Sequence, residues 1–288
     1  MSGRVVVALT MLAMIAFACN SLFCRVALRE TAIDATTFTS IRLVSGALML
    51  WLIVQVRQGR APVPVRGDWT SAFALFVYAA GFSFAYRELP ASTGALLLFG
   101  AVQTTMIGYG LRRGESLGAT QLAGLLLALA GLVGLLLPGL SAPPLAGSLL
   151  MLTAGVAWGV YSLRGKTQGS PLQVTTGNFL RTVPITLALS AVLLSSASVD
   201  PAGVVYAVLS GALASGVGYA LWYAVLPSIR ATTAATVQLS VPPLAALGGI
   251  AFLGETMTWR LLFTTAAVLG GIAMVTLAPR ADRAGRAR

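Results

Sequence analysis

The sequence predicts an all-α membrane protein of ten transmembrane helices, built as two inverted five-helix repeats. Three observations support this fold class. Hydrophobic residues make up 57% of the 288-residue chain and charged residues only 9%, whereas a soluble domain carries about 25% charged residues. The apolar residues are gathered into runs long enough to cross a membrane. The second half of the chain also repeats short motifs of the first half in the same order.

Ten apolar runs follow one another along the chain, and each is long enough to cross about 30 Å of hydrocarbon as a helix. Prolines mark several of the breaks between runs, at Pro62, Pro90, Pro143 and Pro227, because proline disrupts the helix that precedes it. The expected helices span residues 5–28, 34–56, 69–88, 91–111, 116–138, 144–165, 172–194, 201–226, 231–253 and 257–278.

The internal repeat is visible as pairs of motifs separated by about 140 residues, which is typical of a duplicated membrane unit. A Gly-Glu pair occurs at Glu115 and again at Glu255, each time before an apolar run. A Tyr-x-x-Leu-Pro motif begins at Tyr86 and again at Tyr223. We expect both Gly-Glu pairs to open a helix, because a carboxylate in the first turn is favoured by the positive end of the helix dipole.

The number of helices in each repeat predicts that the two repeats are inverted. Each repeat has five helices, an odd number, so the second copy must enter the membrane from the opposite side. The first repeat is expected at residues 1–142 and the second at 143–279, followed by a basic cytoplasmic tail at 280–288.

Basic residues predict the orientation of the chain. The formal net charge is +11, but the basic residues are scattered between apolar runs rather than clustered on one face, so nucleic acid is not an expected partner. Most of them fall on the side of the two termini, which the positive-inside rule places in the cytoplasm, with the protein in the cell inner (plasma) membrane. The residues expected near the opposite face are Arg25, Arg29, Arg87 and Arg260.

The N-terminal segment allows a second interpretation. Its basic start, apolar stretch and Ala16-Phe17-Ala18 segment resemble a secretory signal peptide with a small-x-small cleavage site. The apolar run continues past this segment, however, and its Arg25 has a counterpart, Arg164, in the helix that begins the second repeat. We therefore expect a retained first helix.

The available residue types narrow the possible chemistry. The chain has no histidine, which excludes a histidine-dependent catalytic triad and a histidine-ligated zinc site. The acidic residues are all expected at helix ends or in loops, and no P-loop motif is present. Cys19 and Cys24 lie five residues apart, a spacing that does not share a helix face, so neither a disulfide nor a metal site is expected. We therefore expect no enzymatic activity, no cofactor and no metal.

Taken together, the repeats, their Gly-Glu pairs and an arginine in the second helix of each repeat resemble the drug/metabolite transporter superfamily. Within it, the length and the Pro242-Pro243 pair before Gly254-Glu255 are similar to the ten-helix EamA-type exporters, and most of all to the YddG-type amino acid exporters. The resemblance covers essentially the whole chain and implies movement of small metabolites through a central cavity without ATP hydrolysis. The first repeat departs from the pattern, with Val102-Gln103 in place of Pro242-Pro243, so a symmetric helix break at that level does not follow.

Aromatic and amide residues at mid-membrane depth predict the cavity wall. Tyr78 and Phe82 are four residues apart and so share one face of the third helix, and the repeat places Tyr219 on the matching helix of the second half. An axis through the membrane centre would bring these helices around one cavity. The expected substrate-cavity residues are Asn20, Tyr78, Phe82, Trp158, Tyr161, Tyr219 and Gln238.

These residues also have a purely structural interpretation. Aromatic side chains commonly lie in the interfacial belts of a membrane or pack between helices, and amides commonly form interhelical hydrogen bonds. Tyr78, Trp158 and Tyr219 are expected deepest in the membrane. A hydroxyl or indole facing lipid there would have no partner, which favours cavity lining for these three residues.

Arg42 and Arg181 occupy the same position in the two repeats, about two turns inside their helices. A charge at this depth costs a few kcal/mol unless it is paired or hydrated. Because both halves keep the arginine, we expect a structural role shared by the two halves, with side chains that extend toward the interface. A substrate carboxylate is the alternative partner.

The sequence therefore predicts an exporter of small neutral metabolites, with amino acids as the favoured class, working by alternating access and without a carboxylate proton relay. An aromatic cavity with few charges suits a zwitterion with an apolar side chain. A nucleotide-sugar carrier of the same fold is one alternative, and a non-transport scaffold or lipid flippase is another. The expected partners are a small-molecule substrate and the lipid bilayer; the sequence does not determine the oligomeric state, and a monomer is compatible with it.

Overall fold

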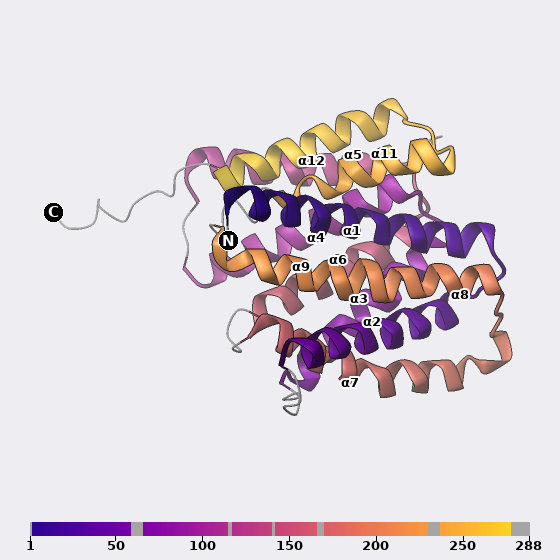
Figure 1. Cartoon of the computed structure of the whole chain (residues 1–288). Helices are drawn as coiled ribbons and strands as arrows, with labels where there is room; N and C mark the ends of the chain where they lie inside the picture. Colours follow the sequence, from indigo (N-terminus) through magenta and orange to yellow (C-terminus); the bar gives the residue numbers. More distant parts are fainter. Residues whose placement is uncertain are drawn as a thin grey trace.

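The computed structural model describes residues 2–58, 66–114, 117–139, 142–165, 170–229 and 237–277, which form a bundle of helices (Figure 1). The described residues contain no strand. The main helices are α1 (Gly3–Glu30), α2 (Ala35–Gln58), α3 (Trp69–Tyr86), α4 (Ala91–Arg112), α5 (Ala119–Leu136), α6 (Leu145–Gly165), α7 (Pro171–Val192), α8 (Pro201–Val208), the π-helix η2 (Leu209–Val217), α9 (Gly218–Val225), α11 (Val241–Leu253) and α12 (Trp259–Leu277).

Eight helical segments of the described chain are long and apolar enough to span a membrane. They comprise α1 to α6, the continuous segment from α8 to α9, and α12. The described part of the ninth run contributes a shorter apolar helix, α11, of 13 residues. The seventh run, α7, has the required length, but it buries polar side chains such as Thr175, Asn178 and Thr182 inside the bundle. The structure therefore agrees with an all-α membrane fold.

The eighth run, expected as one helix over 201–226, is a helix of two kinds. It begins and ends as α-helix, in α8 and α9, but its middle is the π-helix η2. Within η2 the Ser215 hydroxyl donates to the carbonyl of Ser210, five residues earlier, at 2.9 Å. Gly211 faces α2 so closely that a Cβ there would collide with the carbonyl oxygen of Arg42. The wide turn thus lies directly against the middle of α2.

The fourth and ninth runs differ as their sequences suggest. Helix α4 continues without interruption through Val102 and Gln103. In the second half a turn at Leu239 and Ser240 precedes α11, which has Pro242 in its first turn. A helix break at this level is therefore present in the second half only, within the described residues.

The expectation that Glu255 opens its own helix is wrong. Gly254 ends α11 in the left-handed conformation, with φ of 62°, and α12 begins only at Trp259. Glu255 instead lies at the N-terminus of α4, where its Oε1 accepts a hydrogen bond of 2.7 Å from the backbone N–H of Ala91. The carboxylate still meets the positive end of a helix dipole, but the helix belongs to the other half of the chain. The corresponding Glu115 lies outside the described residues.

Most of the close helix pairs join one half of the chain to the other. Helix α5 packs on α12, α2 on α7, and α6 on both α3 and α4, while α1 packs on α9 and α11. Small residues allow close approach: a Cβ on Gly124 of α5 would lie 2.6 Å from the carbonyl oxygen of Gly271 in α12. The start of α1 and the end of α12 lie at the same end of the bundle (Figure 1, left).

Candidate functional site

Aromatic side chains from both halves of the chain meet in the middle of the bundle. The Tyr78 ring of α3 lies 4.7 Å from the Trp158 ring of α6, measured between centroids. Trp158 in turn stacks on Tyr219 of α9 at 5.4 Å, with an angle of 16° between the rings. Phe82 contacts Tyr78 at 5.6 Å, and Tyr161 contacts Trp158 at 5.3 Å. We call Tyr78, Phe82, Trp158, Tyr161 and Tyr219 the central aromatic cluster.

The cluster is densely packed. Tyr78, Phe82, Tyr161 and Tyr219 are all buried, and only Trp158 keeps partial exposure. Each of these residues was expected in the cavity wall, and the structure brings all of them together.

Further rings extend the cluster. Phe17 of α1 and Phe179 of α7 lie 5.6 and 5.9 Å from the Tyr219 ring. Neither was singled out in the sequence, because a lone phenylalanine in an apolar run looks the same whether it faces lipid or the bundle interior. Tyr223, one turn beyond Tyr219 on α9, is 6.3 Å from it and was marked by the repeated Tyr-x-x-Leu-Pro motif.

The two amide residues that were expected in the cavity wall, Asn20 and Gln238, are not part of the central aromatic cluster. The Ser210 hydroxyl of η2 donates to Oδ1 of Asn20 on α1 at 2.6 Å, and both side chains are buried. This contact is an interhelical hydrogen bond of the structural kind. Gln238 is half-buried in the short described stretch before α11.

Arg42 lies deep in the bundle, beside the cluster. Its side chain comes from α2, about two turns from the start of that helix, and the residue is only 2% exposed, so it does not extend to an interface. The guanidinium carbon lies 4.6 Å from the centroid of the Phe82 ring and 5.4 Å from that of Tyr78. Nη2 donates to the Tyr78 hydroxyl at 3.1 Å. Nη1 is buried and has no hydrogen-bond partner among the described residues.

Arg181, the repeat counterpart of Arg42, has different surroundings. Its Nη1 donates to the carbonyl oxygens of Arg66 and Gly177, both at 2.9 Å. Arg66 belongs to the segment before α3, and Gly177 lies one turn earlier on α7. The residue is half-buried. Arg181 therefore joins α7 to the other half of the chain through backbone carbonyls.

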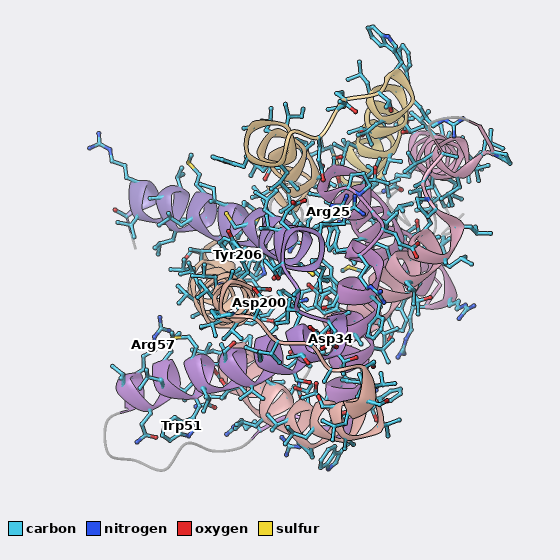
Figure 2. The ribbon with its side chains drawn as sticks, turned by 90° about the vertical axis from the view of Figure 1, so that its right-hand side faces the viewer. Arg25, Asp34, Trp51, Arg57, Asp200 and Tyr206 are labelled. Carbon is cyan, nitrogen blue, oxygen red and sulfur yellow. The ribbon has the colours of Figure 1, made fainter. Side chains whose placement is uncertain are left out.

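A pocket of about 1040 Å³ opens at the end of the bundle opposite the start of α1. Figure 2 looks onto this end, with the lining residues Arg25 and Tyr206 labelled. The pocket reaches Cys19 on α1, two residues beyond Phe17. None of the expected cavity residues lines it.

A smaller pocket of about 200 Å³ is lined by residues of α2 and the start of α7 together with Tyr223. Tyr223 and Phe17 both contact Tyr219. The central aromatic cluster therefore lies between the two pockets.

The described structure contains one ion pair at each end of the bundle. The arginines of these two ion pairs occupy equivalent positions in the two repeats. Arg25 of α1 lies 3.6 Å from Glu255 and also donates to the backbone carbonyl of Tyr86 at 3.1 Å. Arg164 of α6 lies 3.0 Å from Asp68, which caps the N-terminus of α3. Each pair ties one half of the chain to the other.

Asp34 connects two loops at the end that Figure 2 faces. Its carboxylate accepts hydrogen bonds from the backbone N–H of Thr36 at 2.8 Å and of Ser198 at 2.9 Å. Burial raises the pKa of the Asp34 carboxyl, but hydrogen bonds from Thr37, Ser198 and Thr36 outweigh burial. The net pKa of Asp34 therefore lies below its ordinary value.

Comparison with known proteins agrees with this architecture. The EamA-like transporter family matches the chain twice, over residues 4–137 and 145–277. The chain is 57% identical over 286 residues to the uncharacterized protein PA1977 of Pseudomonas aeruginosa, covering 99% of each chain. It is 33% identical over 144 residues to the threonine/homoserine exporter RhtA of Salmonella typhimurium and likewise to RhtA of Escherichia coli, covering 48% of each chain.

A solved crystal structure of a protein has a similar fold. It has a TM-score of 0.69 and 19% sequence identity, and the alignment covers 98% of this chain and all of the other. At this level of identity the likeness concerns the fold.

Proposed function

Because the chain belongs to the EamA-like transporter family, we propose that it exports small neutral metabolites, in particular amino acids with aromatic or other apolar side chains, by alternating access. The predicted resemblance to EamA-type transporters is confirmed by the family match over both halves. The partial similarity to RhtA, a threonine/homoserine exporter, supports amino acids as the substrate class.

The observation that carries this proposal is the central aromatic cluster. Rings from α3 of the first half and from α6 and α9 of the second half meet between two pockets that open at opposite ends. Aromatic side chains with few charges suit a solute whose side chain is apolar. Because the cluster is closely packed, a solute would pass only if the halves moved relative to one another, as alternating access requires.

The helix contacts support two inverted repeats at 1–142 and 143–279. If the halves exchange by a two-fold axis, α1 corresponds to α6, α3 to α8–α9 and α4 to α11. Such an axis would relate the contact between α3 and α6 to a contact between α9 and α1. It would likewise relate the contact between α4 and α6 to one between α11 and α1. All four contacts are present. The pairs α2–α7 and α5–α12 map onto themselves. This pattern favours a two-fold relation between the halves.

The distribution of arginines supports an inner-membrane location with both termini in the cytoplasm. By their places in the helices, more of the described arginines lie at the end of the bundle where α1 begins than at the opposite end. The first group comprises Arg4, Arg57, Arg66, Arg112, Arg113 and Arg164, and the second comprises Arg25, Arg29, Arg87 and Arg260.

We propose facilitated transport down the substrate gradient. All six acidic residues of the described chain lie at helix ends or in turns, so no carboxylate is positioned in mid-membrane to couple protons to transport. Glu88, which lines the larger pocket, is the nearest exception.

In proteoliposomes with equal substrate on both sides, an imposed pH gradient should cause no net accumulation. Accumulation, whether or not it survives Glu88→Gln, would contradict a facilitator.

The direct test is uptake of radiolabelled amino acids into proteoliposomes. The wild type should transport at least one apolar amino acid, and Trp158→Ala and Tyr219→Ala should reduce transport at least tenfold without changing folded yield. Trp51→Ala is the matched control, because Trp51 is 42% exposed on α2, away from the cluster. Transport of nucleotide sugars instead would indicate the other carrier class. No transport of any solute would favour a scaffold or flippase.

A further inference from the structure

The charge of Arg42 is not compensated within the described structure. The two ion pairs there use Arg25 and Arg164, at opposite ends of the bundle. The described acidic residues all lie at helix ends or in turns, whereas Arg42 lies about two turns inside α2 and is 2% exposed. A buried charge without a counterion is strongly unfavourable unless a partner arrives from elsewhere.

The surroundings of Arg42 orient its guanidinium and leave part of its donor capacity unused among the described residues. Contacts with the Phe82 and Tyr78 rings and the hydrogen bond to the Tyr78 hydroxyl hold the guanidinium in one orientation. Nη1 is left buried with its protons unused among the described residues. Because the Tyr78 hydroxyl accepts from Arg42, it retains its own proton for donation to a further oxygen. A donor pair of this kind matches the two oxygens of a carboxylate.

Backbone packing fixes the base of this arrangement. The π-helix η2 lies against α2 at Arg42, where Gly211 leaves no room for a Cβ next to the Arg42 carbonyl oxygen. The Arg42 side chain therefore extends from a rigid point of α2 toward the rings of the central aromatic cluster. π-helical segments are rare and frequently lie at functional sites.

We propose that Arg42 and Tyr78 bind the carboxylate of the transported solute, whose apolar side chain then contacts the rings around Trp158. This inference rests on the proposed function, since it assigns the recognition group for the same solute. A single arginine beside a tyrosine suits a monoanionic carboxylate better than a phosphate, which in proteins usually has several basic partners. The carboxylate supplies the counterion that Arg42 lacks, so solute binding neutralises the charge that is otherwise buried alone.

The test compares acids with their neutral carboxamides on the purified full-length protein. The probes are L-phenylalanine, L-leucine and L-threonine, each paired with its carboxamide, and binding is followed by the shift in melting temperature and by calorimetry. The wild type should bind at least one acid tenfold or more tightly than its amide. Arg42→Gln should bring the ratio near one, and Arg42→Lys and Tyr78→Phe should leave an intermediate preference. Arg181→Gln, the matched control, should keep the wild-type ratio.

Each other outcome decides against the assignment. Equal binding of acid and amide by the wild type would overturn the role of Arg42 while leaving transport of amino acids intact. Absence of binding by all three acids would instead remove the proposed function itself, and the role of Arg42 with it. If the Arg42 variants do not fold, a Tyr78→Phe protein with the full wild-type ratio would overturn the proposal. Displacement of the acid by inorganic phosphate at similar concentrations would point to a phosphate ligand and would also overturn it.

Discussion

Arg42 and Arg181 occupy equivalent positions in the two halves of the chain, yet one is buried without a counterion and the other is held by backbone carbonyls. Repeat symmetry in the sequence therefore does not extend to the surroundings of the side chain. An arginine whose protons are used by the protein can serve the scaffold. An arginine with an unused buried N–H is available to a ligand, at a cost to the empty protein.

The difference arises from the helices that each arginine faces. Arg42 contacts Tyr78 and Phe82 on α3. Their counterparts by repeat are Ser215 and Tyr219, but the Ser215 hydroxyl is engaged inside η2 with the Ser210 carbonyl. The π-helical turn has no equivalent in α3, which is α-helical throughout.

Arg181 instead faces the segment before α3, which lies against α7. The backbone N–H of Asp68 in this segment donates to the Asn178 side chain at 3.0 Å, and Arg66 supplies a carbonyl to Arg181. A structural role stays our prediction for Arg181.

The largest effect on stability is expected at Gly211, where η2 packs closely against the Arg42 backbone of α2. Gly211→Leu should destabilise the protein by about 3 kcal/mol, because the new side chain would overpack the contact with the Arg42 carbonyl and the Ser45 hydroxyl. Folded yield and melting temperature in detergent measure this effect. Gly270→Leu on α12 is the control, because a Cβ at Gly270 meets nothing within 4 Å. Equal loss in both variants would show that the contact with α2 is not special.

The next effect separates the two arginines by stability. Arg181→Met should destabilise the protein by about 2 kcal/mol, because the carbonyls of Arg66 and Gly177 lose a charged donor. The melting temperature should fall, while the affinity of the remaining folded protein for its solute stays unchanged. A variant with normal stability and lost affinity would place Arg181, rather than Arg42, at the solute.

Sequence reasoning found the helices and the five residues of the central aromatic cluster for identifiable reasons. The four-residue spacing of Tyr78 and Phe82 and the repeat alignment with Tyr219 carry local information, which survives folding. It failed for Glu255, because the helix N-terminus that this carboxylate caps is distant in the chain and close only in space. It also placed Arg42 near an interface, since a buried arginine and one that extends to the interface have the same local sequence.

The π-helix was also beyond local reasoning. The glycines at 211, 216 and 218 indicate that the eighth run can bend, but the regular spacing of α-helical residues cannot show where an extra residue enters a turn. The close approach of Gly211 to α2 depends on the packing of two distant segments. Such contacts become visible only in the folded chain.

At Arg42, a smaller effect on stability is expected, opposite in sign to that of Arg181→Met. Arg42→Met should change the stability of the empty protein by no more than about 1 kcal/mol and should raise it, because a similar volume is kept and an uncompensated buried charge is removed. The loss of contacts with the Tyr78 and Phe82 rings opposes this gain. A melting temperature that falls as far as in Arg181→Met would mean that Arg42 is a scaffold residue like its counterpart.

The smallest effect concerns the start of the helix that carries Arg42. The folded-state pKa of Asp34 lies below its ordinary value of about 3.9, so this carboxylate stabilises the folded protein above that pH. The stabilisation is lost as the pH falls through the folded-state pKa. The melting temperature of the wild type should therefore decline below about pH 4. The melting temperature of Asp34→Asn should decline less steeply, from a lower starting value.

At neutral pH, Asp34→Asn should keep the preference for acid over amide, because Asp34 binds the backbone of Ser198 and not the solute. If Asp34→Asn lost the preference for acid over amide, binding of the carboxylate at Arg42 would depend on the hydrogen bonds at the start of α2. The difference between Arg42 and Arg181 would then come from how α2 and α7 are held in the bundle, and not from the contacts of the two arginine side chains.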